Sequence, residues 1–110
     1  MAERDISTGT WTAHQSNNID VRFTLDQTKD GKLSGRAEAI PLADGEKDSG
    51  DVVEFSVVRG NDVQIIVDWD GGSSKGKYVG RFDLSGRLSG NAFDLANPQS
   101  QATWFSEETF

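Results

Sequence analysis

The strongest constraint in this sequence is a strict alternation of apolar and polar residues. Residues 19–26 read Ile-Asp-Val-Arg-Phe-Thr-Leu-Asp, with an apolar side chain at every second position. Residues 63–69 repeat the pattern, with Val63, Ile65, Val67 and Trp69 on one side. Successive side chains of a β-strand point to opposite faces, so a period of two predicts strands with one buried face. No long stretch has the 3.6-residue period of a helix. The predicted fold class is therefore all-β.

Eight strands are predicted, at a spacing typical of a β-sandwich or barrel. They span residues 9–15, 19–26, 32–40, 51–59, 62–69, 76–84, 87–95 and 102–106, and turn-forming Gly, Asn and Asp lie between them. Eight strands suffice to close an antiparallel up-and-down β-barrel and to remove both exposed edges. We expect one barrel domain at 9–106, a disordered N-terminal segment at 1–8, a C-terminal tail at 107–110 and a solvated loop at 43–50.

The charge balance limits the partners that this chain can have. Eighteen acidic and eleven basic residues give a formal net charge of −7, which would repel a nucleic-acid backbone. No apolar run approaches the roughly 18 residues of a membrane span. We expect a cytoplasmic protein, or a secreted one if Met1 replaces a removed leader. The chain has no cysteine, so neither disulfide nor thiolate chemistry is expected.

The alternation also predicts which side chains fill the barrel. The inward set is Trp11, Ala13, Ile19, Val21, Phe23, Leu25, Leu33, Val53, Phe55, Val57, Val63, Ile65, Val67, Trp69, Tyr78, Phe82, Leu84 and Leu88. An eight-stranded barrel is just wide enough to be filled by side chains or to hold one small ligand, and both outcomes stay open. A ligand at the barrel mouth would stack on Trp69, Trp11 and Tyr78, with Phe23 and Phe82 lining the wall.

The outer surface departs from the alternation on the later strands. Six apolar residues are predicted to face outward there: Val52, Val58, Ile66, Val79, Phe93 and Phe105. Neighbouring strands would bring Ile66, Val79, Phe93 and Phe105 into one patch. A contiguous exposed apolar patch usually marks an association site. This patch predicts a homo-oligomer that forms through one wall of the barrel.

Several short motifs resemble the avidin/streptavidin family of the calycins. Gly9-Thr10-Trp11 opens the first strand, Gly31-Lys32-Leu33-Ser34-Gly35 lies at the second hairpin, Val67-Asp68-Trp69 ends the fifth strand and Tyr78-Val79-Gly80 lies on the sixth. The resemblance implies an eight-stranded up-and-down barrel, with oligomers that use the walls of the later strands.

The family's biotin-binding residues are mostly replaced in this chain. Ala13 stands where the family has an asparagine, and Ala37 and Ala39 stand where it has a tyrosine and a serine. Serine replaces a tryptophan near Ser74, and only Trp69 keeps a ligand-stacking position. The resemblance therefore implies the barrel but not biotin, because the hydrogen bonds to a buried polar ligand would be missing.

No pattern in the sequence predicts catalysis or a bound metal. Gly72-Ser73-Ser74-Lys75-Gly76 matches the Gly-x-Ser-x-Gly nucleophile pattern, but a hairpin lacks the strand–elbow–helix context which that motif requires. His14 is the only histidine, so a zinc site would lack ligands. Residues 26–31 resemble the start of an EF-hand loop, but Ala37 stands where the bidentate glutamate is required. We expect no catalytic residue, no metal and no cofactor.

Taken together, these features predict a small binding module and not an enzyme. Its ligand would be small and apolar or aromatic, and it would bind at the barrel mouth. The alternative is a filled barrel that acts as an interaction or structural protein, or a carbohydrate-binding module that uses Trp104 at the rim.

Overall fold

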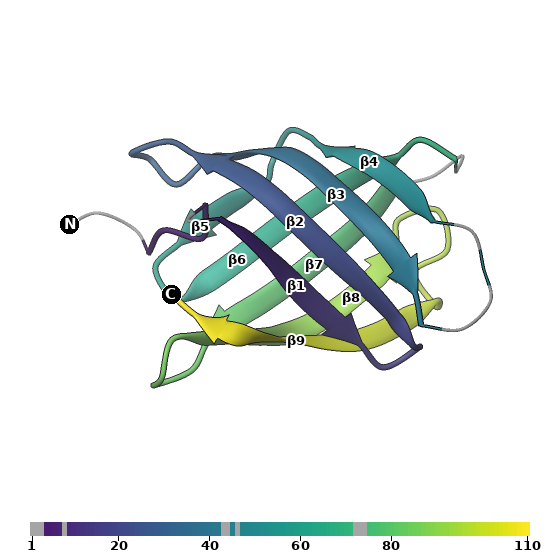
Figure 1. The fold of residues 1–110 in the computed structure, drawn as a ribbon. Coiled ribbons are helices and arrows are strands. Elements are labelled where there is room, and N and C mark those ends of the chain that lie inside the picture. The colour runs from purple at the N-terminus through teal and green to yellow at the C-terminus, as the bar shows by residue number, and fades with distance from the viewer. Residues whose placement is uncertain (1–3, 8, 43–44, 46, 72–74) are drawn as a thin grey trace.

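The computed structural model describes residues 4–7, 9–42, 45, 47–71 and 75–110, and this part of the chain contains strands and no helix. Figure 1 shows the strands wrapped around a common interior. They are β1 (Thr10–Gln15), β2 (Ile19–Gln27), β3 (Leu33–Pro41), β4 (Asp48–Val52), β5 (Val57–Arg59), β6 (Asp62–Trp69), β7 (Lys75–Phe82), β8 (Arg87–Asp94) and β9 (Gln101–Thr109).

The nine strands close an eight-stranded antiparallel barrel in up-and-down order. Consecutive strands pair with each other except β4 and β5, and β1 closes the sheet by pairing with β9. The short strands β4 and β5 pair with opposite ends of β6, so together they occupy one position in the barrel. The all-β fold class and the barrel architecture predicted from the sequence are confirmed.

The middle of the barrel is filled by four aromatic rings that contact one another in a closed circuit. The ring of Trp11 lies 5.0 Å from that of Phe23 and 6.2 Å from that of Trp104, between centroids. Tyr78 completes the circuit, 5.4 Å from Phe23 and 6.3 Å from Trp104. Aromatic pairs at such distances stabilise a core beyond their burial alone. Side chains therefore fill the barrel interior at the level of these four rings.

Trp104 belongs to this core and does not lie at the rim, so the predicted carbohydrate platform is wrong. Its side chain is 2% exposed, and its indole N–H donates to the Asn91 carbonyl at 3.0 Å. Gly80 makes the space for the ring, since a Cβ at that position would lie 2.7 Å from the indole. A strand glycine often marks such a close approach.

The described residues near the two chain ends, 4–7 and 107–110, belong to the packed structure, where a disordered segment and a tail were expected. Ile6 is fully buried, and its carbonyl accepts a hydrogen bond of 2.9 Å from the Trp11 indole. β9 continues to Thr109, and the ring of Phe110 lies 5.3 Å from that of Trp11. The Arg4 guanidinium donates to the Phe110 carbonyl. Ile6 and Phe110 therefore pack against the core at this end of the barrel, where β9 ends at the left of Figure 1.

The predicted strand 51–59 is broken, and its side chains face the opposite way from the prediction. Val52 and Val58 are 7% and 0% exposed and point inward, whereas Phe55 is 76% exposed. Two Val-Val pairs, at 52–53 and 57–58, allow either face of this segment to be buried. The apolar Phe55 leads to the prediction that its own face is buried, and this prediction is wrong. A shift by one residue moves every side chain of a strand to the other face. Val53, Phe55 and Val57 therefore lie on the outside.

Leu84 is also exposed, although the alternation predicts it inside. β7 ends at Phe82, and Leu84 lies in the turn that leads to β8. Asp83 holds this turn through hydrogen bonds from Ser85 and Arg87. The chain leaves the sheet two residues before the alternation ends, so Leu84 has no core to face.

Candidate functional site

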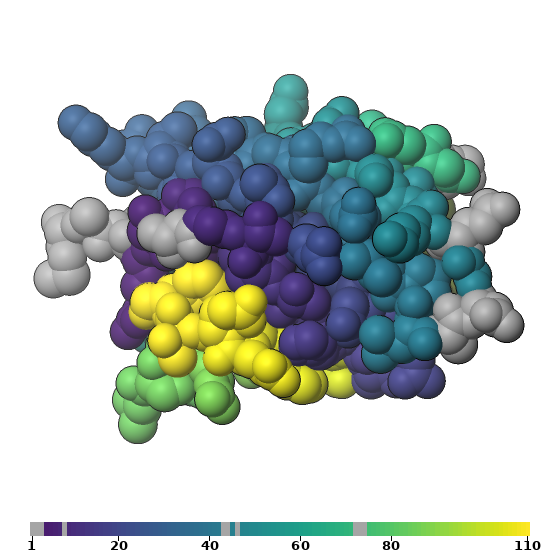
Figure 2. All heavy atoms as spheres, viewed as in Figure 1, coloured from purple at the N-terminus to yellow at the C-terminus, as the bar shows by residue number. Residues whose placement is uncertain are grey.

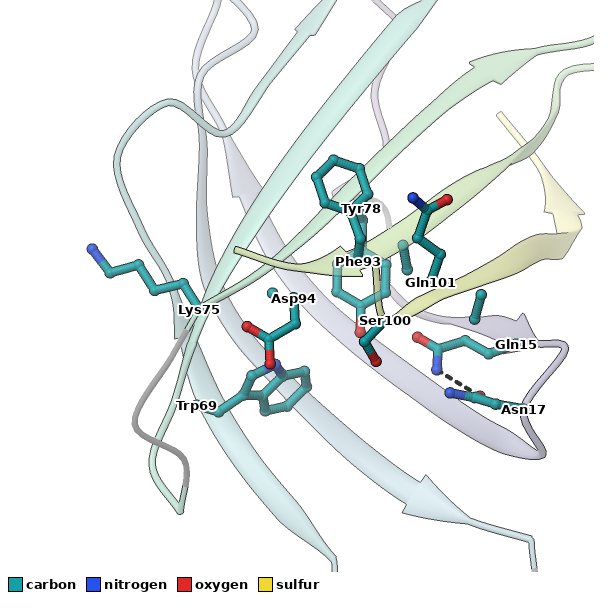
Figure 3. A pocket seen from close by; sticks show the side chains of 12 residues that line it. Gln15, Asn17, Trp69, Lys75, Tyr78, Phe93, Asp94, Ser100 and Gln101 are labelled. Carbon is teal, nitrogen blue, oxygen red and sulfur yellow. Dashed lines mark hydrogen bonds between the residues drawn. The ribbon is translucent and has the colours of Figure 1, made fainter. Parts of the chain in front are cut away.

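A cavity with a partly polar lining lies at the barrel end opposite the two termini. Its volume is about 160 Å³. It is lined by Gln15, Asn17, Trp69, Lys75, Gly76, Tyr78, Ala92, Phe93, Asp94, Ser100, Gln101 and Ala102. In Figure 3, Trp69 lies on one side of the opening, Gln15 and Asn17 lie on the other, and Asp94 and Ser100 lie between them. We call this cavity the mouth pocket.

The lining residues come from strand ends, which the up-and-down order gathers at one rim. Trp69 is the last residue of β6, Asp94 the last of β8 and Gln15 the last of β1. Gly76 on β7 lets the indole of Trp69 lie against the backbone, because a Cβ there would be 2.9 Å from the indole nitrogen. Strand ends far apart in sequence thus place an aromatic ring beside polar groups.

Gln15 contributes an unusual polar group to this pocket. Its amide nitrogen donates to the Asn17 side-chain oxygen at 2.9 Å, drawn as a dashed line in Figure 3. Its Oε1 atom is buried and has no hydrogen-bond partner among the described residues. A buried acceptor without a partner costs roughly 1–3 kcal/mol. Such a group is a natural acceptor for a ligand donor.

Tyr78 is a buried residue that lines the mouth pocket. The residue is 5% exposed, and burial raises the pKa of its phenol well above the usual value of 10.0. Loss of the proton would place a charge in a low-dielectric core. The hydroxyl therefore stays neutral at physiological pH and can serve as a hydrogen-bond donor or acceptor.

The charged residues of the pocket have different positions. The Asp94 carboxylate accepts a hydrogen bond of 2.8 Å from the Ala96 backbone N–H, which fixes it at the start of the β8–β9 connection. In Figure 3 the Lys75 side chain points away from the other labelled groups. The pocket therefore presents the Asp94 carboxylate and neutral side-chain amides, and the Lys75 ammonium lies at its edge.

The structure brings two of the five predicted ligand residues to the mouth pocket. Trp69 and Tyr78 line it. Trp11 and Phe23 are buried in the core, and Phe82 packs near the closed end, 6.3 Å from the Phe110 ring. The alternation predicts these three beside the others because it identifies the inward face but not the depth of a residue along the barrel.

Sequence reasoning missed the polar lining residues Gln15, Asn17, Ser100 and Gln101. Each lies at a strand end or in a turn, where polar residues are common and carry no signal on their own. Their common location at one rim follows from the strand order. Knowledge of that order could have identified them.

The four residues of the predicted oligomer wall do not form one patch. Ile66 pairs in register with Lys77, and Lys77 with Phe93, so a cation lies between the two apolar side chains. The ammonium of Lys77 lies 5.8 Å from the Phe93 ring centroid. Val79 is flanked by Gln64 and Asn91. Phe105 lies beside Ser89 on β8, and its ring is 5.3 Å from that of His14. The predicted patch is therefore interrupted.

The remaining sequence motifs have ordinary structural roles where they are described. His14 bonds to Asp20 at 3.0 Å on the outer wall. Residues 26–31 form a hairpin turn, in which the Gly31 N–H donates to the Thr28 carbonyl at 3.0 Å. Three residues of the Gly-x-Ser-x-Gly match, 72–74, lie outside the described residues. Within the described part of the chain, no group of three or more His, Cys, Asp or Glu side chains could hold a metal ion.

Comparisons with protein-family models, with curated proteins and with solved structures find no match to this chain. The barrel is compatible with a streptavidin-like fold, and the resemblance to that family rests on the short motifs and on this architecture. Among the described residues no helix has the length and apolar character to cross a membrane.

Proposed function

We propose that this chain is a non-enzymatic binding module whose mouth pocket holds a small ring-shaped ligand. The observation that carries the proposal is the Gln15 Oε1 atom, which is buried without a partner at the same opening as the half-buried Trp69 ring. A flat ligand can stack on the indole and donate a hydrogen bond to the amide oxygen. Both contacts are typical of small-molecule sites.

The volume of the pocket limits the ligand to about one ring. At about 160 Å³ it resembles an engineered cavity of about 150 Å³ that takes up benzene. A ligand that extends down the barrel axis would displace the Tyr78 and Phe23 rings, which are 5.4 Å apart in the core. Larger ligands therefore fit only if the remainder protrudes into solvent.

The pocket also narrows the chemistry of the ligand. The sequence predicts only that the ligand is small and apolar or aromatic. The described rim adds the polar side chains of Gln15, Asn17, Ser100 and Gln101, together with the Asp94 carboxylate. A ring that carries an N–H or O–H donor satisfies the buried acceptor, whereas an unsubstituted ring leaves it orphaned.

Ligand-observed NMR with benzene and phenol tests this proposal directly. We expect phenol to bind about tenfold more tightly, which corresponds to about one satisfied hydrogen bond. The substitution Gln15→Leu should abolish this preference. It should also leave the free protein at least as stable, because it removes an orphaned acceptor. Asn91→Leu, an exposed amide-to-leucine change on the outer face of β8, is the matched control and should change neither result.

Two outcomes would contradict the proposal. One is that neither ring binds at millimolar concentration. The other is that the preference for phenol survives Gln15→Leu, which would place the donor contact elsewhere. Quenching of tryptophan fluorescence gives an independent signal, because Trp69 is half-buried whereas Trp11 and Trp104 are each 2% exposed.

A filled-barrel interaction protein is the second candidate. The observation that favours it is the closed circuit of core rings, which leaves only the mouth for a ligand. An outer surface would then perform the function. The segment 51–59, whose side chains face opposite to the prediction, provides a candidate for that surface.

A further inference from the structure

The connection between β4 and β5 presents an aromatic ring to solvent in a strained conformation. Phe55 has a φ of 72° and is 76% exposed. This left-handed conformation is uncommon for residues other than Gly, Asn and Asp, and it is rarer still for a bulky side chain. In Figures 1 and 2 this connection projects from the top of the barrel. A turn with no other role would be expected to carry Gly or Asn here.

A buried serine holds this turn rigidly. Ser56 is 3% exposed, and its hydroxyl accepts from the Ile66 N–H and donates to the Val53 carbonyl, both at 2.8 Å. The Phe55 carbonyl accepts from the Gln64 side-chain amide at 2.8 Å. The turn that carries the ring is therefore held by three hydrogen bonds in the free protein. Such preorganisation reduces the entropy lost on binding.

The ring lies at an apolar groove on the outer wall. The groove has a volume of about 1160 Å³, and its apolar lining includes Val53, Phe55, Val57, Ile66 and Leu95. Leu95 is 41% exposed, and the Leu95 N–H donates to the Lys75 carbonyl at 2.9 Å, which ties the β8–β9 connection to the groove edge. We call this surface the Phe55 groove.

The charge of the Phe55 groove is opposite to that of the whole chain. The described residues that line it include three cations, Lys32, Arg59 and Lys75, and one carboxylate, Glu54. The full sequence has 18 acidic and 11 basic residues. A locally positive apolar surface on an acidic protein attracts an anionic partner and repels cationic ones.

We propose that the Phe55 groove is a docking site for an acidic peptide segment of another protein, with an apolar side chain as anchor. The exposed Phe55 ring and the neighbouring aliphatic residues would contact the anchor, and the three cations would pair with flanking carboxylates. A second copy of this chain fits less well. A twofold interface would set the same cations against each other, and two chains of charge −7 repel.

Selection from a phage-displayed library of random peptides, about twelve residues long, tests this inference. Wild-type protein is the bait, and Phe55→Asn protein removes peptides that bind elsewhere. We expect enriched peptides to combine Asp or Glu with large apolar residues and to bind more weakly as salt rises. Phe55→Asn should weaken binding at least about 30-fold, as for a central interface anchor. The double variant K32E/K75E should weaken it about tenfold.

Phe105→Thr provides the matched control, because Phe105 is also an exposed aromatic residue, at 50% exposure, but lies on β9. It should leave peptide binding unchanged. The inference is overturned if no acidic peptide is enriched, or if the enriched peptides are neutral or basic. It is also overturned if Phe55→Asn binds as well as wild type. Sedimentation of wild type as a dimer that Phe55→Asn converts to a monomer would assign the groove to a second copy instead.

Discussion

The strain at Phe55 leads to a prediction that does not depend on any partner. Replacement of Phe55 by Asn removes the exposed ring and supplies a residue that tolerates a φ of 72°. Replacement by Ala removes the ring but keeps a Cβ in the same strained backbone. A comparison of the two variants therefore separates the backbone strain from the contacts of the ring.

The structure sets the size of each effect. A left-handed conformation costs a residue with a Cβ roughly 1–2 kcal/mol, of which Asn recovers about 1 kcal/mol. The ring is 76% exposed, so its removal loses about a quarter of a full phenylalanine burial, or about 0.5 kcal/mol. We expect Phe55→Asn to gain about 0.5 kcal/mol and Phe55→Ala to lose about the same.

Urea denaturation followed by tryptophan fluorescence measures both variants, because Trp11 and Trp104 are buried in the core. The two free energies of unfolding should differ by about 1 kcal/mol in favour of Asn. An Asn variant that is less stable than the Ala variant would refute the strain argument. In that case the turn would owe its geometry to contacts of the ring and not to the Ser56 hydrogen bonds.

Three further predictions concern the core and the turn. Ser56→Ala leaves the Ile66 N–H without its acceptor and the Val53 carbonyl without its donor, so urea denaturation should report a loss of roughly 2–4 kcal/mol. Gly90→Ala places a Cβ 1.8 Å from the Val79 carbonyl oxygen and should cost about 3 kcal/mol by thermal unfolding. At Gly9 a Cβ meets no described atom within 4 Å, so Gly9→Ala should cost about 1 kcal/mol for its φ of +83°. Burial raises the pKa of Tyr78 above 10.0 in the folded state, so its contribution to stability is intact below pH 10.0 and is lost as the pH rises further; an ultraviolet titration of this single tyrosine should show no phenolate until the protein unfolds.

Strands with one clearly buried face could be predicted well from sequence. β2 has a single apolar residue at every second position, and Val21, Phe23 and Leu25 are buried as expected. β6 behaves in the same way, with Val63, Ile65 and Val67 buried. In both strands only one face can be covered, so the pattern leaves no choice.

The segment 51–59 could not be predicted in this way, because its sequence permits both faces. Val52 or Val53 can be buried, and so can Val57 or Val58. The buried Ser56 hydroxyl bonds to the nearby Val53 carbonyl and to the Ile66 N–H, which only the folded sheet brings within reach. The Phe55 groove exists as a result of that choice.

The sequence alone determined that this chain forms an antiparallel barrel, because its periodicity is local and each strand carries its own pattern. Three features required the tertiary structure. Strand order gathers Gln15, Trp69 and Asp94 at one rim of the barrel. The described residues near the two chain ends meet at the other rim. The pairing of β5 with β6 sets the outward face of Phe55. Each depends on contacts between residues far apart in the chain. A local pattern predicts which side of a strand is apolar, but only the assembled sheet decides what that side meets.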